Sequence, residues 1–289
     1  MSTRRAKRPG TIEPPRDVIS TKREKIFIES KGGNKTTKKV MIITTYETIN
    51  TIRIYIGNRD IYCMDVQLLK DSETQTATTG HLEKARWDTV CSLDEPFGKG
   101  TDTILMIKTL INYIKNTYPN VEALTFNDMS TKTCDDGSSV SLAAMKLFTD
   151  GETWYETHFD ISLDTYNKSL YETIKKTINE KKRELSFDKF SMYSNTSALS
   201  IQNGKLRIIY DESDTWQKFF SEIRNIVGIS KLCVWLSKNN WFDIFLHTIL
   251  KVNIASILFM LEVRPYDNII YKLINNIGGK YRFSRKNYR

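Results

Sequence analysis

A glycine pair at the start of an apolar-periodic segment has the residue types best suited to binding a phosphate. Gly98, Lys99 and Gly100 precede Thr101 and Thr103. Glycine lets the backbone approach a ligand, and the first N–H groups of a helix attract anions because they lack partners inside the helix. Lysine adds charge, and a threonine hydroxyl can cap the helix or bind a phosphate oxygen. The GK[ST] of a Walker A loop and the third glycine of a dinucleotide fingerprint are missing, so a turn that only begins a helix remains the alternative.

Acidic residues further along the chain are the candidates for proton transfer. Asp128 follows a strand-like run and lies close in sequence to Ser130, Asp135 and Asp136. Ligands of α/β units bind at the carboxyl ends of strands, so Asp128, or Glu156 further on, is a candidate general base for an amine. The alternative is loop chemistry, because Asp and Ser also make turns and cap helices.

The cysteines and histidines show no metal-binding spacing. They are Cys63, Cys91, Cys134, Cys233, His81, His158 and His247. We therefore expect no zinc site, and we expect reduced, structural thiols, which suit an intracellular compartment. A nucleophilic Cys134 would need His158 as its base and a third group to orient the pair.

The spacing of apolar residues changes along the chain, and it predicts which elements would position these residues. Alternating β-branched runs at 40–47, 51–57 and 61–69 predict an antiparallel meander, which continues after a polar loop at 70–81 with a fourth strand at 85–93. A second set of elements follows the meander. Apolar residues at three- and four-residue steps predict a helix over 101–117, then a strand at 121–128 and a helix at 139–151 that closes at Gly151.

The remainder of the chain is predicted to be mainly helical. A charged helix is expected at 162–185, and Asn203-Gly204 favours a type I′ turn in a hairpin over 198–210. Helices are expected from 213 onward. The apolar stretch 241–263 contains Asp243, His247, Lys251 and Asn253, so we expect no membrane span.

The meander followed by glycine turn, helix, strand and helix resembles the GNAT N-acyltransferase superfamily over about residues 39–159. That family binds acetyl-CoA with a [QR]-x-x-G-x-[GA] turn at the start of its central helix. The corresponding stretch here is EPFGKG, in which Gly98 and Gly100 match and Glu95 replaces the Gln or Arg. In the next helix AMKLFTDG is similar to a family pattern, with Phe148 where a tyrosine general acid often stands. The two helices that the family inserts after its first strand have no counterpart.

The resemblance implies a cofactor and a site. Acetyl-CoA would be held through its pyrophosphate by Gly98, Lys99, Gly100, Thr101 and Thr103. The backbone of the strand at 121–128 would hold the pantetheine, and Asp128 or Glu156 would be the base. Phe148 cannot donate a proton.

A second resemblance connects residues 123–159 to uncharacterised proteins of large nucleocytoplasmic DNA viruses. These carry a similar D-[MD]-S…C…SL…G-[KE]-T-W-Y-E-x-x-F signature. The matching positions are Asp128, Ser130, Cys134, Ser141, Leu142, Gly151, Thr153, Trp154, Tyr155, Glu156 and Phe159. This resemblance implies the host cytoplasm or a virion as the place of action, and it names no activity.

The basic composition suits phosphate-bearing partners, and an ordinary positively charged protein is the equal alternative. The chain has 289 residues, with Lys+Arg 43 against Asp+Glu 34 and a formal net charge of +9. Much of the excess lies in two expected basic tails, a flexible one at 1–38 and another at 281–289. Between them we expect a GNAT-like α/β domain at 39–160 and a mainly helical domain with one hairpin at 161–280.

The expected fold is therefore α+β, with a mixed and mostly antiparallel sheet, a GNAT-like helix-strand-helix core and a helical C-terminal domain. Two functions stay open. One is an acetyl-CoA-dependent N-acyltransferase with an unidentified acceptor. The other is a non-catalytic viral structural or nucleic-acid-associated protein that binds nucleic acid or virion proteins through its basic termini.

Overall fold

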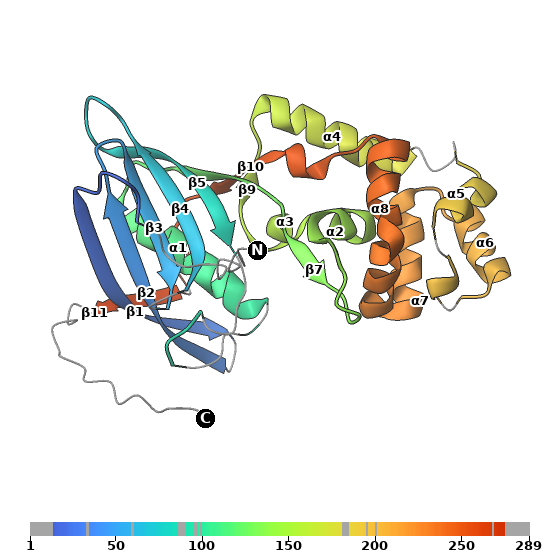
Figure 1. The fold of residues 1–289 in the computed structure, drawn as a ribbon, viewed down its shortest axis with the longest axis horizontal. Coiled ribbons are helices and arrows are strands. Elements are labelled where there is room, and N and C mark those ends of the chain that lie inside the picture. The colour runs from blue at the N-terminus through green and yellow to red at the C-terminus, as the bar shows by residue number, and fades with distance from the viewer. Residues whose placement is uncertain are drawn as a thin grey trace, which may run out of the picture. The chain divides into compact units, whose positions relative to one another are not determined.

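The computed structural model describes residues 14–32, 35–58, 61–85, 91–94, 98, 100–180, 185–194, 196–199, 201–267 and 269–274. These residues form an α+β fold with a mixed, mostly antiparallel sheet and a helical region toward the C-terminus, as the sequence predicts (Figure 1). The chain divides into two compact units. The first unit is Met1–Thr125 with Glu262–Arg289, and the second is Phe126–Leu261. Residues 126–160, which we expected in the first domain, thus belong with the helices that follow them.

The first unit is built on an antiparallel meander. Its strands are β1 (Ser20–Gly32), β2 (Lys35–Glu47), β3 (Thr51–Gly57), β4 (Tyr62–Lys70) and β5 (Ala77–Ala85). At one edge, β11 (Ile269–Ile274) pairs antiparallel with β1. Next to β5, β6 (Ala123–Asn127) pairs in parallel with it and is not an edge strand. The chain passes between the two units within β6 and within β10 (Leu258–Glu262).

The predicted fourth strand is wrong in its position. β5 occupies part of the expected polar loop, while Cys91–Asp94 is a series of bends and residues 86–90 lie outside the described part of the chain. Threonines made this stretch look like a loop. Threonine is β-branched, however, and suits a strand with one solvated face.

The expected N-terminal tail is wrong from residue 20 onward, while residues 1–13 lie outside the described part. In β1 the alternate residues Ile26 and Ile28 are fully buried, because β1 pairs with both β2 and β11. β11 itself is a correction, since we expected a helix there. The paired strands are more than two hundred residues apart in the sequence, so no local pattern predicts their pairing.

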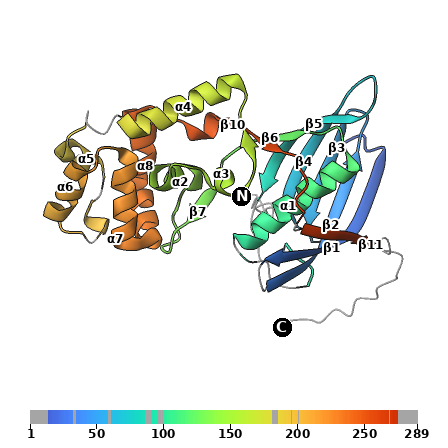
Figure 2. The ribbon, with the colours of Figure 1, turned by 180° about the vertical axis from the view of Figure 1, so that it is seen from behind.

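One face of the sheet in the first unit carries α1 (Thr101–Thr117), which Figure 2 shows from the side of the helix. The bounds of α1 match the predicted helix. Its apolar stripe, including Leu105, Leu110 and Ile114, is buried. Polar and charged residues occupy most of its other positions, as expected for an amphipathic helix on a sheet.

The second unit is mainly helical. Its α-helices are α2 (Leu142–Asp150), α3 (Trp154–His158), α4 (Thr165–Glu180), α5 (Phe187–Tyr193), α6 (Asn203–Glu212), α7 (Trp216–Ser237) and α8 (Trp241–Ile244). A short hairpin of β7 (Thr131–Thr133) and β8 (Ser139–Ser141) precedes α2. The strand β9 (Ile161–Ser162) pairs with β10. α7 is interrupted at Gly228, whose φ of 81° is not helical.

The hairpin predicted over 198–210 is wrong, because α6 lies there. A type I′ turn needs positive φ at both central residues, and neither Asn203 nor Gly204 has it. Leu206 and Tyr210 are four residues apart and both are buried on one helix face. An aromatic core that includes Phe190, Trp216 and Phe245 provides the partners for this face (Tyr210–Trp216 ring centroids 5.8 Å apart).

The expectation of reduced thiols is also wrong. Cys63 is bonded to Cys91 in the first unit, and Cys134 to Cys233 in the second. Their Cα–Cα distances of 5.9 and 5.5 Å are normal for disulfides. The pairs are separated by 28 and 99 residues, so the fold rather than sequence spacing brings them together. Among the helices of the described residues, none is long and apolar enough to cross a bilayer.

Candidate functional site

The predicted site residues fall into two groups, one in each unit. The first group is the glycine turn before α1. Gly100 is the N-cap of α1 with φ 73° and ψ −85°, a conformation that side chains disfavour. An added Cβ at Gly100 would meet nothing within 4 Å, so the backbone conformation is what calls for glycine there. Thr101 is exposed, Thr103 is half-buried, and Lys99 lies outside the described residues.

A carboxylate that sequence reasoning missed occupies this turn. Asp102 Oδ2 accepts a hydrogen bond from the Gly98 N–H at 2.6 Å. Lys39 Nζ, from β2, lies 3.6 Å from the same oxygen, and both side chains are buried. Asp102 therefore compensates the positive end of the helix and the Lys39 ammonium together. A ligand phosphate at the Gly98 N–H would have to displace it.

The sequence could have indicated Asp102 as a residue of this turn, but it could not have indicated Lys39. Acidic residues are common in the first turn of a helix, because they interact favourably with the helix dipole. Lys39 precedes this turn by about sixty residues and is brought to it only by the packing of α1 on the sheet.

The segment that leads to the turn is fixed to the sheet. The Cys63–Cys91 disulfide joins it to β4. The Leu93 N–H donates to the Val40 carbonyl oxygen at 2.8 Å, and the Val40 N–H donates to Asp94 Oδ1 at 3.2 Å. Residues 91–94 are thus bound to β2 beyond the end of β3, a few residues before Gly98.

The strands on either side of α1 form a parallel pair. Gly80 pairs with Leu124 and His81 with Thr125, and Thr125 Oγ1 donates to the Gly80 carbonyl oxygen at 3.1 Å. A Cβ at Gly80 would lie 2.5 Å from a Leu124 methyl and 2.7 Å from a Leu68 methyl, so a larger residue would require both leucine side chains to shift. The ladder ends after His81 and Thr125, although β5 continues to Ala85.

The second group of candidates begins with Asp128, directly after β6. Its side chain is almost fully buried, with 2% exposure. Oδ1 accepts hydrogen bonds from the backbone N–H of Ser130, at 3.1 Å, and from the Ser130 hydroxyl. Oδ2 is buried without a hydrogen-bond partner among the described residues. Burial raises the pKa of Asp128, the Ser130 hydrogen bonds oppose this, and the charge of Glu156 adds to it.

Glu156 is occupied by structural contacts. It forms a capping box at the start of α3, in which the Thr153 N–H donates to Glu156 Oε2 at 2.7 Å. The Tyr171 hydroxyl donates to the same oxygen at 2.5 Å, and Lys175 Nζ lies 3.4 Å from Oε1. Burial, followed by the hydrogen bond to Glu156, raises the pKa of Tyr171 well above its ordinary value. The capping box could be predicted from the sequence T-W-Y-E. The contacts of Glu156 with Tyr171 and Lys175 of α4 could not.

Other candidates have structural roles. Phe148 is fully buried and packs against Phe220 and Phe242, with ring centroids 5.2 and 5.3 Å away, so it belongs to the core. Cys134 is disulfide-bonded, which excludes a Cys134–His158 nucleophile in this form of the protein. Within the described ranges, no group of three or more His, Cys, Asp or Glu side chains is arranged to hold a metal ion.

Comparison with known proteins supplies no relative. No protein-family model, no curated protein and no solved structure matches the chain.

Proposed function

We propose that the first unit is a divergent GNAT-like module that binds an acyl-CoA at the turn before α1 and serves N-acyl transfer to an amine. The observation that carries the proposal is the parallel pairing of β5 with β6, with α1 as the crossover between them. In such units ligands bind where the parallel strands end and the crossover helix begins. Here the Gly98–Gly100 turn lies between β5 and β6 in the sequence and beside Lys39 of β2 in space, and the β5–β6 ladder stops after two residue pairs.

The residues would divide the work between pyrophosphate and pantetheine. The free N–H groups at the start of α1, with the hydroxyls of Thr101 and Thr103, would bind the pyrophosphate once Asp102 releases the Gly98 N–H. Lys39, which pairs with Asp102 in this structure, would then pair with the bound pyrophosphate instead. The part of the β6 backbone that faces β5 beyond the end of their ladder would hydrogen-bond the pantetheine amides. Asp128 and Glu156, the bases predicted from the sequence, belong to the second unit and carry structural contacts there, so the proposal assigns no base.

The experiment is isothermal titration of the oxidised, full-length protein with acetyl-CoA at two salt concentrations. We expect micromolar binding that weakens with salt. Thr101→Asp adds a negative charge to the first turn of α1, where it favours the helix, and we expect it to reduce affinity by at least about tenfold. Ser72→Asp, in an exposed turn, makes the same change in net charge and is expected to bind as the wild type does.

Folded protein that gives no heat with acetyl-CoA would end the acyltransferase proposal. Equal loss of affinity in both variants would show that net charge, and not the turn before α1, governs binding.

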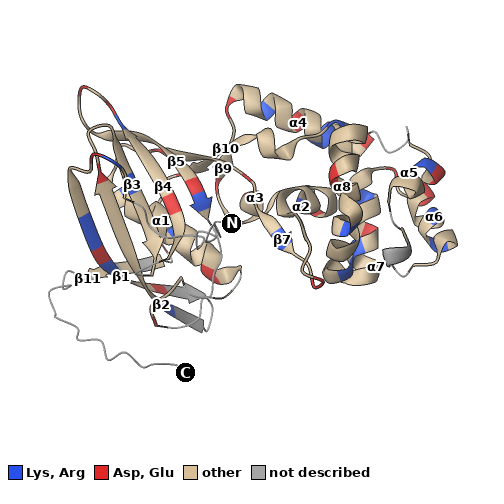
Figure 3. Ribbon diagram, in the orientation of Figure 1, with Lys and Arg blue, Asp and Glu red and all other residues tan. Residues whose placement is uncertain are grey.

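A second candidate function is a non-catalytic virion protein, and the two disulfides favour it. Disulfides persist in oxidising environments, virion surfaces among them, and are rare in a reducing cytosol. The virion is thus the more suitable of the two places of action that the viral resemblance implies. Figure 3 shows basic and acidic residues intermixed over the described parts of both units, so this function would rely on the basic termini. Fluorescence anisotropy of full-length protein with labelled oligonucleotides tests it, and binding that does not weaken with salt would contradict it.

A further inference from the structure

Two turns of the same chemical type are found at opposite ends of the β7–β8 hairpin. At its base, Asp128 accepts hydrogen bonds from the backbone and hydroxyl of Ser130. At its tip, Asp136 accepts from the backbone of Ser138 at 3.0 Å and from the Ser138 hydroxyl at 2.5 Å. Both are Asp-x-Ser turns in which a side-chain carboxylate replaces a backbone acceptor.

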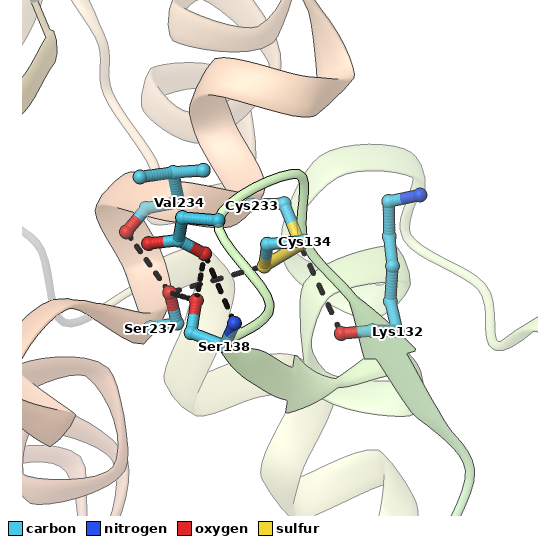
Figure 4. Close-up of a disulfide and its surroundings, with 7 residues drawn as sticks. Lys132, Cys134, Ser138, Cys233, Val234 and Ser237 are labelled. Carbon is cyan, nitrogen blue, oxygen red and sulfur yellow. Dashed lines mark hydrogen bonds between the residues drawn. A yellow bond between two sulfur atoms is a disulfide. The ribbon is translucent and has the colours of Figure 1, made fainter.

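The tip of the hairpin is fastened to α7. Cys134 is bonded to Cys233, and Ser138 Oγ lies 2.6 Å from Ser237 Oγ (Figure 4). The disulfide does not depend on the charge of Asp136, which is exposed. Any opening of the hairpin must therefore begin at its base.

The base is held by a different means. The Ser130 carbonyl oxygen accepts the Leu142 N–H at 2.9 Å, which closes the hairpin onto the start of α2. Asp128 fixes Ser130 through Oδ1, while its Oδ2 is enclosed without a partner. A protonated carboxyl tolerates such a site, whereas a carboxylate with one unsolvated oxygen does not.

Among the described residues, the side chains that interact with Asp128 carry no positive charge. α3 contributes Glu156, whose charge repels an ionised Asp128, and Tyr155, which is buried. α4 contributes Tyr171, whose hydroxyl is already donated to Glu156. The Lys175 ammonium is paired with Glu156. Opening of the base, which lets water reach Oδ2, is therefore the available response to ionisation.

We propose that the Asp128 carboxyl is a proton-dependent latch for the base of the β7–β8 hairpin. Protonated Asp128 keeps the Asp128–Ser130 turn closed against α2, and ionised Asp128 releases it. The disulfide keeps the tip in place in both states, so the released segment is confined to residues 128–133 and 139–142. The latch is independent of acyl-CoA binding by the first unit.

Amide hydrogen exchange of the full-length, oxidised protein tests the latch between pH 4 and 8. The readouts are the Ser130 and Leu142 amides, corrected for intrinsic exchange. A group that is protonated when closed and ionised when open lowers protection by up to about tenfold per pH unit, from about pH 4 to its own pKa in the closed state, and then levels off. We expect this profile in the wild type and a flat one in Asp128→Asn.

Three further variants separate the latch from a general effect of pH. Ser130→Ala removes a hydroxyl that favours the ionised form, so the levelling point moves to higher pH. Glu156→Gln removes the facing negative charge and keeps an oxygen for the capping box, so that point moves to lower pH. Asp136→Asn is the matched control and leaves the profile unchanged. A flat wild-type profile, or the same slope in Asp128→Asn, would overturn the proposal.

Discussion

Asp128 and Asp136 receive the same hydrogen bonds, yet their carboxyl groups respond in opposite ways to the fold. The pKa of Asp128 is raised, and burial is the main cause. The pKa of Asp136 is lowered, because the Ser138 hydroxyl and N–H stabilise its charged form and water still reaches it. The local turn is constant, so the difference comes from the loss of solvent around Asp128.

The comparison teaches that a motif does not define the chemistry of a residue. D-M-S and D-G-S are both ordinary turn sequences, and both appeared in our sequence analysis as one acidic cluster. The fold separates them into a buried carboxyl and a solvated one. Three sets of substitutions test how much cross-linking, ion pairing and burial each contribute to stability.

The largest expected effect is on the tip of the hairpin. Replacing both Cys134 and Cys233 by Ala removes a cross-link between residues that are 99 positions apart. The loop-closure entropy of the unfolded chain predicts that this loss lowers the free energy of unfolding by about 4.7 kcal/mol. Urea unfolding followed by tryptophan fluorescence measures it, since Trp154, Trp216 and Trp235 lie in the second unit. The same change at Cys63 and Cys91, 28 residues apart, is expected to leave this transition in place. Equal loss from both pairs would contradict an effect that is local to each unit.

The second effect concerns a buried carboxylate that has a partner. Asp102→Ala leaves the Lys39 ammonium without its Asp102 partner and removes the acceptor of the Gly98 N–H, so we expect a loss of about 3–5 kcal/mol in the first unit. Adding Lys39→Met to Asp102→Ala should recover part of that loss, because a buried charge is then removed. Thermal unfolding by circular dichroism measures both variants. A double variant less stable than Asp102→Ala would show that the pair is not coupled.

The smallest effects compare Asp128 and Asp136 directly. The raised pKa of Asp128 contributes stability that is present below the unfolded pKa and is lost as pH rises through the folded value. Asp128→Asn should therefore gain stability relative to wild type, on the order of 1 kcal/mol, as pH rises to 8. The lowered pKa of Asp136 has the opposite sign, since its contribution is lost as pH falls through the folded value.

Asp136→Asn should consequently have a lower urea midpoint than wild type near neutral pH, by a small amount that stays nearly constant from pH 8 down to about pH 4. Urea midpoints of the three proteins from pH 4 to 8 give the measurement. If Asp128→Asn lost stability relative to wild type as pH rises, burial would not be the dominant influence on Asp128.

Local pattern predicted much of the fold. The periodicity of 101–117 defined α1, and alternation defined most of β2, β3 and β4. The β1–β11 pair was missed because its hydrogen bonds join the two ends of the chain, and the charges around Ile26 and Ile28 resemble a solvated tail. α6 was missed because the Asn203-Gly204 pair was interpreted as a hairpin turn. The four-residue spacing of Leu206 and Tyr210, which indicates a helix, was given less weight.

The candidate site was less predictable than the fold. Gly98, Gly100 and Asp128 were proposed as site residues from residue type alone. The side chains that contact the turn and Glu156 come from other elements. Lys39 reaches Asp102 from β2 and Tyr171 reaches Glu156 from α4, and only packing brings them close. The disulfides show the same limit, because four cysteines allow three pairings and the sequence does not choose among them.

The pairing of β1 with β11 has a consequence for synthesis of the protein. The second unit is inserted within the first, so a ribosome completes it before it makes β11. At ordinary translation rates, β1 waits on the order of tens of seconds for its outer partner. Throughout that time the nascent sheet has an open edge that other strands can join. β11 therefore covers the outer edge of β1, and a product that ends before β11 would have a complete helical unit and an unpaired β1 edge.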